Sequence, residues 1–156
     1  MRKKLLSIMM LFVLTFSVFT QSSQGIVQAA EEKVVVDGSE LLDGVEEVEA
    51  EMIPITKGVY LQTGSSSIGK IGTGKIKVSS TTIAQKQVAT IKTAVMVERL
   101  VNGSWVSYTS WTATKSNAYS LVTAKEMVVP RGYYYRVCSY HYANSDIGSS
   151  NTDALY

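Results

Sequence analysis

The chain contains 156 residues, of which 46% are hydrophobic, and its formal net charge is +2. A chain of this length can bury one sizeable hydrophobic core. It has one cysteine and one histidine. A disulfide within the chain is therefore excluded, and a zinc site lacks the three or four ligands that it needs.

The first thirty residues have the parts of a secretory signal peptide. Residues 2–4 are basic, residues 5–20 are almost all apolar, and Ala29 and Ala30 suit a cleavage site. The apolar run of about 16 residues is shorter than the ~20 that a spanning helix needs. We therefore expect residues 1–30 to be removed on export, which leaves a secreted protein without a transmembrane segment. The alternative is an uncleaved N-terminal anchor.

Residues 31–53 form an acidic arm in front of a basic domain. Nine acids and one lysine give residues 31–51 a net charge of −8, whereas residues 52–156 carry +7 from eleven Lys and Arg against four acids. We expect the arm to be disordered, and one hypothesis is that it folds back to mask a binding surface. A basic domain attracts anions, and outside a cell we expect an anionic cell-wall polymer or glycan rather than nucleic acid.

Residues 54–156 show strand-like runs separated by turn residues. Residues 59–63 predict a short strand, and residues 71–78 predict a glycine-interrupted one. The pairs Gly69-Lys70 and Gly74-Lys75 do not fit a phosphate-binding loop, because isoleucine follows each. Residues 85–87 are expected to be a connector.

The most regular pattern lies in residues 89–111. Positions 89, 91, 93, 95 and 97 are Ala, Ile, Thr, Val and Val, which alternate with residues that are more polar on average. This period of two is typical of a strand with one buried face. Asn102-Gly103 suits a tight type I′ turn. We predict a β-hairpin that continues to Trp111.

Three further strands, with loops and a turn around them, complete the pattern. After an expected loop at residues 114–118, residues 119–129 predict a strand, and residues 130–132 a turn. Residues 133–142 predict a strong strand, residues 144–150 a loop, and residues 152–156 a last strand. About seven strands without a convincing helix indicate one antiparallel β-sandwich of immunoglobulin or fibronectin type III character.

The strand at residues 133–142 offers the candidate binding residues. If Tyr135 and Val137 point inward, alternation places four other side chains outward, where aromatic rings beside a cation could stack on sugars. The alternative is that these rings only cover neighbouring strands. The candidate binding residues are Tyr134, Arg136, Tyr140 and Tyr142.

Catalysis finds little support in the sequence. Cys138 and His141 have opposite parity on one strand, so they cannot form a dyad. Glu98 and Glu126 are the only glutamates after residue 51, and we expect them in surface ion pairs. We predict no enzyme activity, catalytic residue, metal or cofactor. Cys138 is expected to be a small apolar residue; a Cys138-linked dimer is the alternative, and the oligomeric state stays open.

Several motifs are shared with known proteins. They are GKIKV from Gly74, VERLVNGSW from Val97, Trp111, PRGYYYRV from Pro130, and the final TDALY. Over about the last hundred residues the chain resembles a family of small secreted proteins of low-GC Gram-positive bacteria to which no function is assigned. The resemblance implies a secreted β-sandwich and no activity. Cys138 departs from the polar or small residue expected there.

Two functions follow as hypotheses. The first is a secreted, non-enzymatic binding protein that attaches to anionic polymers of the cell envelope, since its domain is basic and rich in tyrosine. The alternative is a bacteriocin-like or toxin-like effector that acts on a membrane or protein target.

Overall fold

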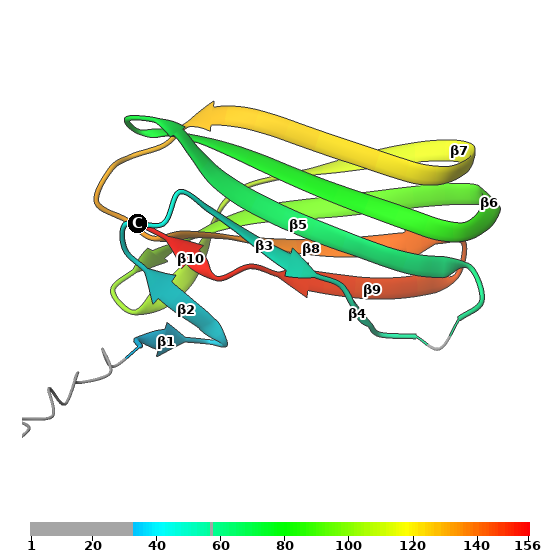
Figure 1. Cartoon of the computed structure of the whole chain (residues 1–156), viewed down its shortest axis with the longest axis horizontal. Coiled ribbons are helices and arrows are strands. Elements are labelled where there is room, and N and C mark those ends of the chain that lie inside the picture. The colour runs from blue at the N-terminus through cyan, green and yellow to red at the C-terminus, as the bar shows by residue number, and fades with distance from the viewer. Residues whose placement is uncertain (1–32, 57) are drawn as a thin grey trace, which may run out of the picture. The chain divides into compact units, whose positions relative to one another are not determined.

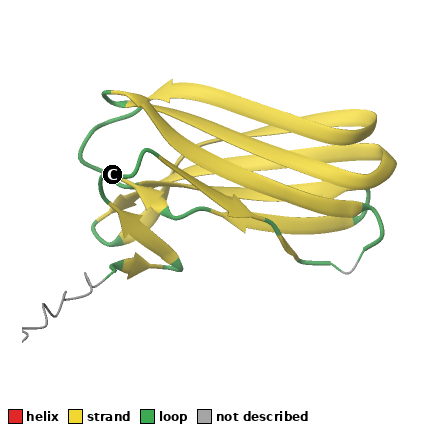
Figure 2. Ribbon diagram, viewed as in Figure 1, coloured by secondary structure: helices red, strands yellow, loops and turns green. Residues whose placement is uncertain are grey.

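The computed structural model describes residues 33–56 and 58–156, so the expected signal peptide lies outside the described residues. All regular elements in the described part are strands, joined by loops and turns (Figures 1 and 2). No helix within those ranges has the length and apolarity required to cross a membrane. The strands are β1 (Val35–Val36), β2 (Ser39–Leu42), β3 (Glu47–Glu51), β4 (Ile53–Pro54), β5 (Leu61–Gly72), β6 (Lys75–Val101), β7 (Ser104–Val128), β8 (Tyr135–Ala143), β9 (Asp146–Asn151) and β10 (Ala154–Leu155).

The predicted hairpin is confirmed and is much longer than expected. Strands β6 and β7 pair from Val101 opposite Ser104 to Lys75 opposite Val128. At the turn, Asn102 and Gly103 have φ angles of 51° and 78°, as a tight hairpin turn requires. The expected breaks at residues 85–87 and 114–118 lie inside these strands, where the pairing register shifts between Ile83 and Val88.

The hairpin bends at this register shift, and each part belongs to a different region of the sheet (Figure 1). We call the β5 half the region in which residues 75–84 of β6 lie between β5 and residues 120–128 of β7, with β3 beyond β5. In the β8 half, residues 88–101 of β6 lie between β8 and residues 104–118 of β7, with β9 beyond β8.

The all-β expectation is therefore confirmed, but the two-sheet sandwich is not clearly formed. Because β6 and β7 run through both halves, hydrogen bonds join the strands into one curled, open sheet. The sequence hides this continuity, since the exposed polar residues at the bend resemble a loop.

The acidic arm differs from the disordered segment expected for residues 31–53. Strand β3 pairs with β5 from Glu47 opposite Gly69 to Glu51 opposite Ser65, and β2 runs parallel to β10. In β3 the glutamates are exposed, whereas Val48 and Ala50 are partly buried. The charge of this segment concealed a regular alternation that lets its backbone join the sheet.

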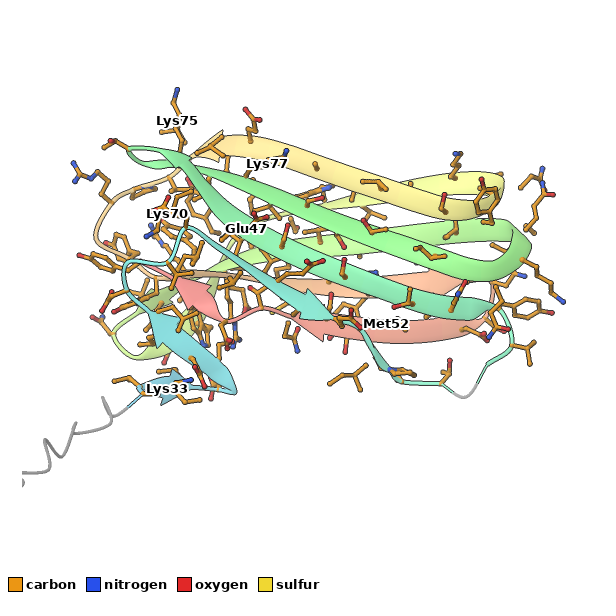
Figure 3. All side chains as sticks on the ribbon, in the orientation of Figure 1. Lys33, Glu47, Met52, Lys70, Lys75 and Lys77 are labelled. Atoms are coloured by element: carbon orange, nitrogen blue, oxygen red, sulfur yellow. The ribbon has the colours of Figure 1, made fainter. Side chains whose placement is uncertain are left out.

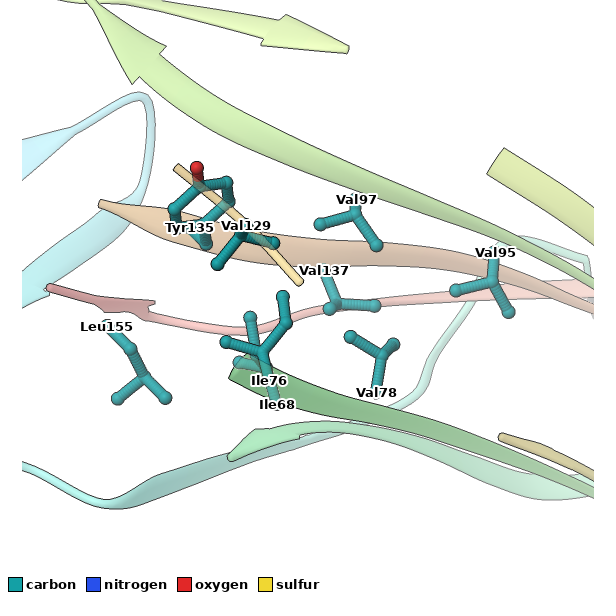
Figure 4. Close-up of a cluster of buried hydrophobic side chains, with 9 residues drawn as sticks. All are labelled: Ile68, Ile76, Val78, Val95, Val97, Val129, Tyr135, Val137 and Leu155. Atoms are coloured by element: carbon teal, nitrogen blue, oxygen red, sulfur yellow. The ribbon is translucent and has the colours of Figure 1, made fainter. Parts of the chain in front are cut away.

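The core between the halves has two hydrophobic clusters. The larger one, drawn in Figure 4, combines side chains from both halves, among them Ile68 and Val78 from the β5 half and Val95 and Val137 from the β8 half. The smaller cluster gathers around Ile91 near the bend. The buried residues between the two clusters are mostly polar.

Candidate functional site

The structure decides which face of β8 is buried, which the sequence had left as a condition. Tyr135, Val137 and Ser139 are buried, and their neighbours lie on the outer face. Tyr134, which precedes the strand, donates a hydrogen bond of 2.9 Å from its hydroxyl to Asp43 of the acidic segment. The pKa of Tyr134 is raised by partial desolvation and by this carboxylate. The ring of Tyr134 is therefore engaged within the chain.

Arg136 is also engaged by its own chain. Its Nε donates to the carboxylate of Glu98 at 2.8 Å, and only 12% and 13% of the two side chains are exposed. Its guanidinium lies 4.3 Å from the centre of the Trp105 ring, and Nη1 donates to the Asp37 carbonyl oxygen and the Ser39 hydroxyl. This arrangement fastens the β1–β2 segment to the outer face.

Tyr140 and Tyr142 are left on the outer face of β8. The side chain of Tyr140 is 46% exposed, and the Lys92 ammonium lies 3.9 Å from the centre of the Tyr142 ring. The structure thus separates the four candidate residues into two pairs. Tyr134 and Arg136 form hydrogen bonds to the acidic segment. Tyr140 and Tyr142 lie farther along the outer face of β8.

The single histidine belongs to a buried network that we call the polar belt. It contains Ser66, Ser80, Thr82, Thr93, Ser139, His141 and Ser150, all 0–1% exposed. Its hydrogen bonds cross between the halves: Ser66 contacts Ser139 at 2.6 Å and Ser150 at 2.7 Å. Thr82 contacts Thr93 at 2.6 Å and His141 Nδ1 at 2.8 Å.

His141 has the contacts of a catalytic base but not its surroundings. Its Nε2 lies 2.8 Å from the Ser150 hydroxyl, yet a threonine, not a carboxylate, contacts Nδ1. Both side chains are inaccessible to solvent or nearly so, so a substrate has no approach. Burial lowers the pKa of His141 to about 4. The imidazole is neutral at pH 7 and serves to link the halves.

Cys138 lies on the opposite face from His141, as its parity predicted. Burial and the nearby Glu98 carboxylate raise the pKa of Cys138 to about 11, so its thiol is protonated at neutral pH. Among residues 33–56 and 58–156, no three His, Cys, Asp or Glu side chains are grouped so that they could hold a metal ion.

A pocket of about 500 Å³ opens at the end of the molecule that carries the β5–β6 turn. We call it the basic pocket. Its rim includes Lys70 at the end of β5 and Lys75 at the start of β6, and Figure 3 shows both lysines at this end. Arg131, from the loop between β7 and β8, completes the set of cations.

Turn geometry places these cations together. Gly74 and Gly132 have φ angles of 64° and 83°, which glycine adopts without strain. The carbonyl of Gly74 accepts a hydrogen bond of 2.9 Å from the Val129 amide, which joins the β5–β6 turn to the β7–β8 loop. Tyr135 donates from its hydroxyl to the Pro130 carbonyl at 2.8 Å. The pocket walls are therefore fixed by hydrogen bonds within the chain.

The charged side chains that line the basic pocket are all cationic. No Asp or Glu side chain lines it, and within the described part of the chain the ion pairs found, Lys33–Glu40 and Arg136–Glu98, do not involve its cations. Cations gathered around one cavity attract an anion. The sequence contains the parts of this pocket, which are the two Gly-Lys pairs and the run PRGY from Pro130. Nothing in the linear sequence shows that these parts lie together in the fold.

The comparisons with known proteins give one result. The model of a family of unknown function, DUF6147, matches residues 27–155. No curated protein and no solved structure matches the chain.

Proposed function

Because the chain belongs to this family of unknown function, we propose its role from geometry: a non-enzymatic binding protein that holds anionic components of the bacterial cell envelope in the basic pocket. The observation that carries the proposal is that Lys70, Lys75 and Arg131 line one cavity whose lining includes no Asp or Glu side chain. Cations gathered around one cavity bind anions and also speed their association.

The location outside the cell is part of the same proposal. Residues 1–30 have the charge and hydropathy of a signal peptide, and an exported basic protein meets the anionic polymers of a Gram-positive envelope first. The resemblance of the motifs to small secreted proteins supports this placement.

The test is co-sedimentation of the purified chain with insoluble cell walls over a salt series. We expect the bound fraction to fall as salt rises, because screening weakens contacts between charges. Lys70→Glu with Lys75→Glu should abolish binding. Lys86→Glu with Lys115→Glu makes the same change in net charge near the bend of β6 and β7, far from the pocket, and should retain most of it.

Two outcomes would overturn the pocket as the site. Equal losses in both double variants would show that net charge alone matters. A loss in Tyr140→Ala, with no loss in the Lys70/Lys75 variant, would move the site to the outer face of β8, where Tyr140 is exposed.

A further inference from the structure

The floor of the basic pocket is the hydrophobic core itself. Four of its lining side chains, Ile76, Val129, Tyr135 and Leu155, are only 2–6% exposed and belong to the larger core cluster. Figure 4 shows these four side chains gathered at one end of that cluster. The pocket is thus apolar at its base and cationic at its rim.

This division indicates a ligand with two chemically different parts. A simple inorganic anion or a charged polymer repeat would gain nothing from the apolar floor. Because the floor side chains are already only 2–6% exposed, the gain comes from the ligand: an apolar chain laid on the floor leaves water, and this stabilises the complex in proportion to the area of the chain that is covered. The volume, about 500 Å³, is within the range of small-molecule sites.

We propose that the basic pocket binds an anionic amphiphile, with its phosphate or carboxylate headgroup between the cations and its apolar chain on the floor. This inference rests on the proposed function and names the class of its ligand. Lys70 and Lys75 stand on opposite sides of the β5–β6 turn, and Arg131 approaches from a separate loop. Lys70 and Arg131 therefore offer one headgroup cations from two segments, while Lys75, next to the inward-facing Ile76, projects away from the floor (Figure 3).

The aromatic walls are already held in place for such a ligand. The Arg99 guanidinium lies 5.0 Å from the centre of the Tyr133 ring, and the rings of Tyr134 and Tyr156 are 5.0 Å apart. Tyr135 is fixed by its bond to Pro130. Side chains that are ordered before binding lose less conformational entropy when a ligand arrives.

The experiment is isothermal titration of the full chain with alkyl phosphates from methyl to decyl, each below its micelle concentration. We expect affinity to rise about fourfold per methylene until the chain fills the pocket. Lys70→Glu with Lys75→Glu should weaken every member at least tenfold. Lys86→Glu with Lys115→Glu is the matched control, and melting temperatures confirm that both variants fold.

The outcomes separate this inference from the proposed function. Inorganic and methyl phosphate binding as tightly as decyl phosphate would overturn the amphiphile and leave an anion site. Equal binding of neutral decyl maltoside would also overturn it. If neither cell walls nor any phosphate binds, the proposed function falls as well.

Vesicles distinguish the two sources of such a ligand. Binding to phosphatidylglycerol vesicles that decyl phosphate displaces, without binding to phosphatidylcholine vesicles, would identify a lipid headgroup. Binding of monomeric decyl phosphate without vesicle binding would identify a soluble amphiphile. Vesicle binding that decyl phosphate fails to displace would contradict the pocket.

Discussion

Cys138 and His141 are three residues apart on β8, yet Cys138 lies on the outer face and His141 on the buried face. The reason is that successive strand residues face opposite ways. His141 enters the polar belt, whereas Cys138 lies on the outer face beside Glu98, with its sulfur 3.5 Å from the carboxylate. The sequence was sufficient for this separation. It was not sufficient for the belt, because serines and threonines at alternating positions resemble an exposed face.

The thiol of Cys138 should react slowly in the folded protein. At pH 8 a pKa of about 11 leaves about a thousandth of the thiol ionised, and the thiolate is the reactive form. We expect labelling by Ellman's reagent to be at least tenfold slower in buffer than in guanidinium chloride. We also expect no disulfide-linked dimer after air oxidation. Rapid labelling of the folded chain, or a dimer band on a non-reducing gel, would contradict this prediction.

Gly64 should tolerate no side chain, because it lies directly against His141. A Cβ at this position would approach Nδ1 to 2.6 Å and Cγ to 2.7 Å. The ring cannot move aside, since Thr82 and Ser150 hold both nitrogens. We expect Gly64→Ala to lower the free energy of unfolding by about 1–3 kcal/mol, as overpacked cores do.

A glycine on the same strand provides the control. A Cβ at Gly69 would meet its nearest atom, Glu47 Cγ, at 3.4 Å, and Glu47 is exposed. Urea unfolding of Gly69→Ala should therefore give a much smaller change than Gly64→Ala. Equal effects at both positions would remove the role assigned to the contact with His141.

At the scale of elements, alternation predicted where strands exist, but not where they end. The hairpin turn at Asn102-Gly103 and the alternation of β8 follow from turn chemistry and period, but period alone did not say which face of β8 is buried. The bends of β6 and β7 do not, because Gln, Lys, Asn and Ser are equally suited to an exposed bend and a loop. The expected loop at residues 144–150 has the same explanation, since β9 is rich in Gly and Ser.

Asn117 should be important to the bend of β7. Its φ angle is 50°, a left-handed conformation that asparagine and glycine adopt more easily than other residues. We expect Asn117→Ala to cost about 1 kcal/mol of unfolding free energy, and Asn117→Gly to cost little. Chemical denaturation of the two variants checks this. A smaller cost for alanine than for glycine would show that φ is not the determinant.

At the scale of the whole molecule, the border between the acidic and the basic part of the sequence is not a border in the fold. The acidic segment was expected to be separate, but β2 and β3 pair with β10 and β5. Composition could identify its charge but not these partners, because β2 pairs with a strand more than a hundred residues away and β3 with one about twenty residues away. The basic pocket was missed for the same reason: its cations come from two distant segments.

The polar belt makes the stability of the whole fold depend on pH. Buried His141 has a pKa of about 4, whereas in the unfolded chain its pKa is near 6.5. As pH falls from about 6.5 to 4, the unfolded chain gains a proton that the folded protein does not. We therefore expect the free energy of unfolding to fall by about 3 kcal/mol over this interval from His141 alone.

His141→Asn isolates this contribution from that of the carboxylates. The variant should be less stable at pH 7, since it loses contacts to Thr82 or Ser150, but its stability should depend less on pH between 6.5 and 4. Because the acidic residues are identical in both proteins, the difference between their pH curves belongs to the histidine. Parallel curves would mean that the imidazole accepts its proton in the folded state, and that water reaches the belt between the two halves.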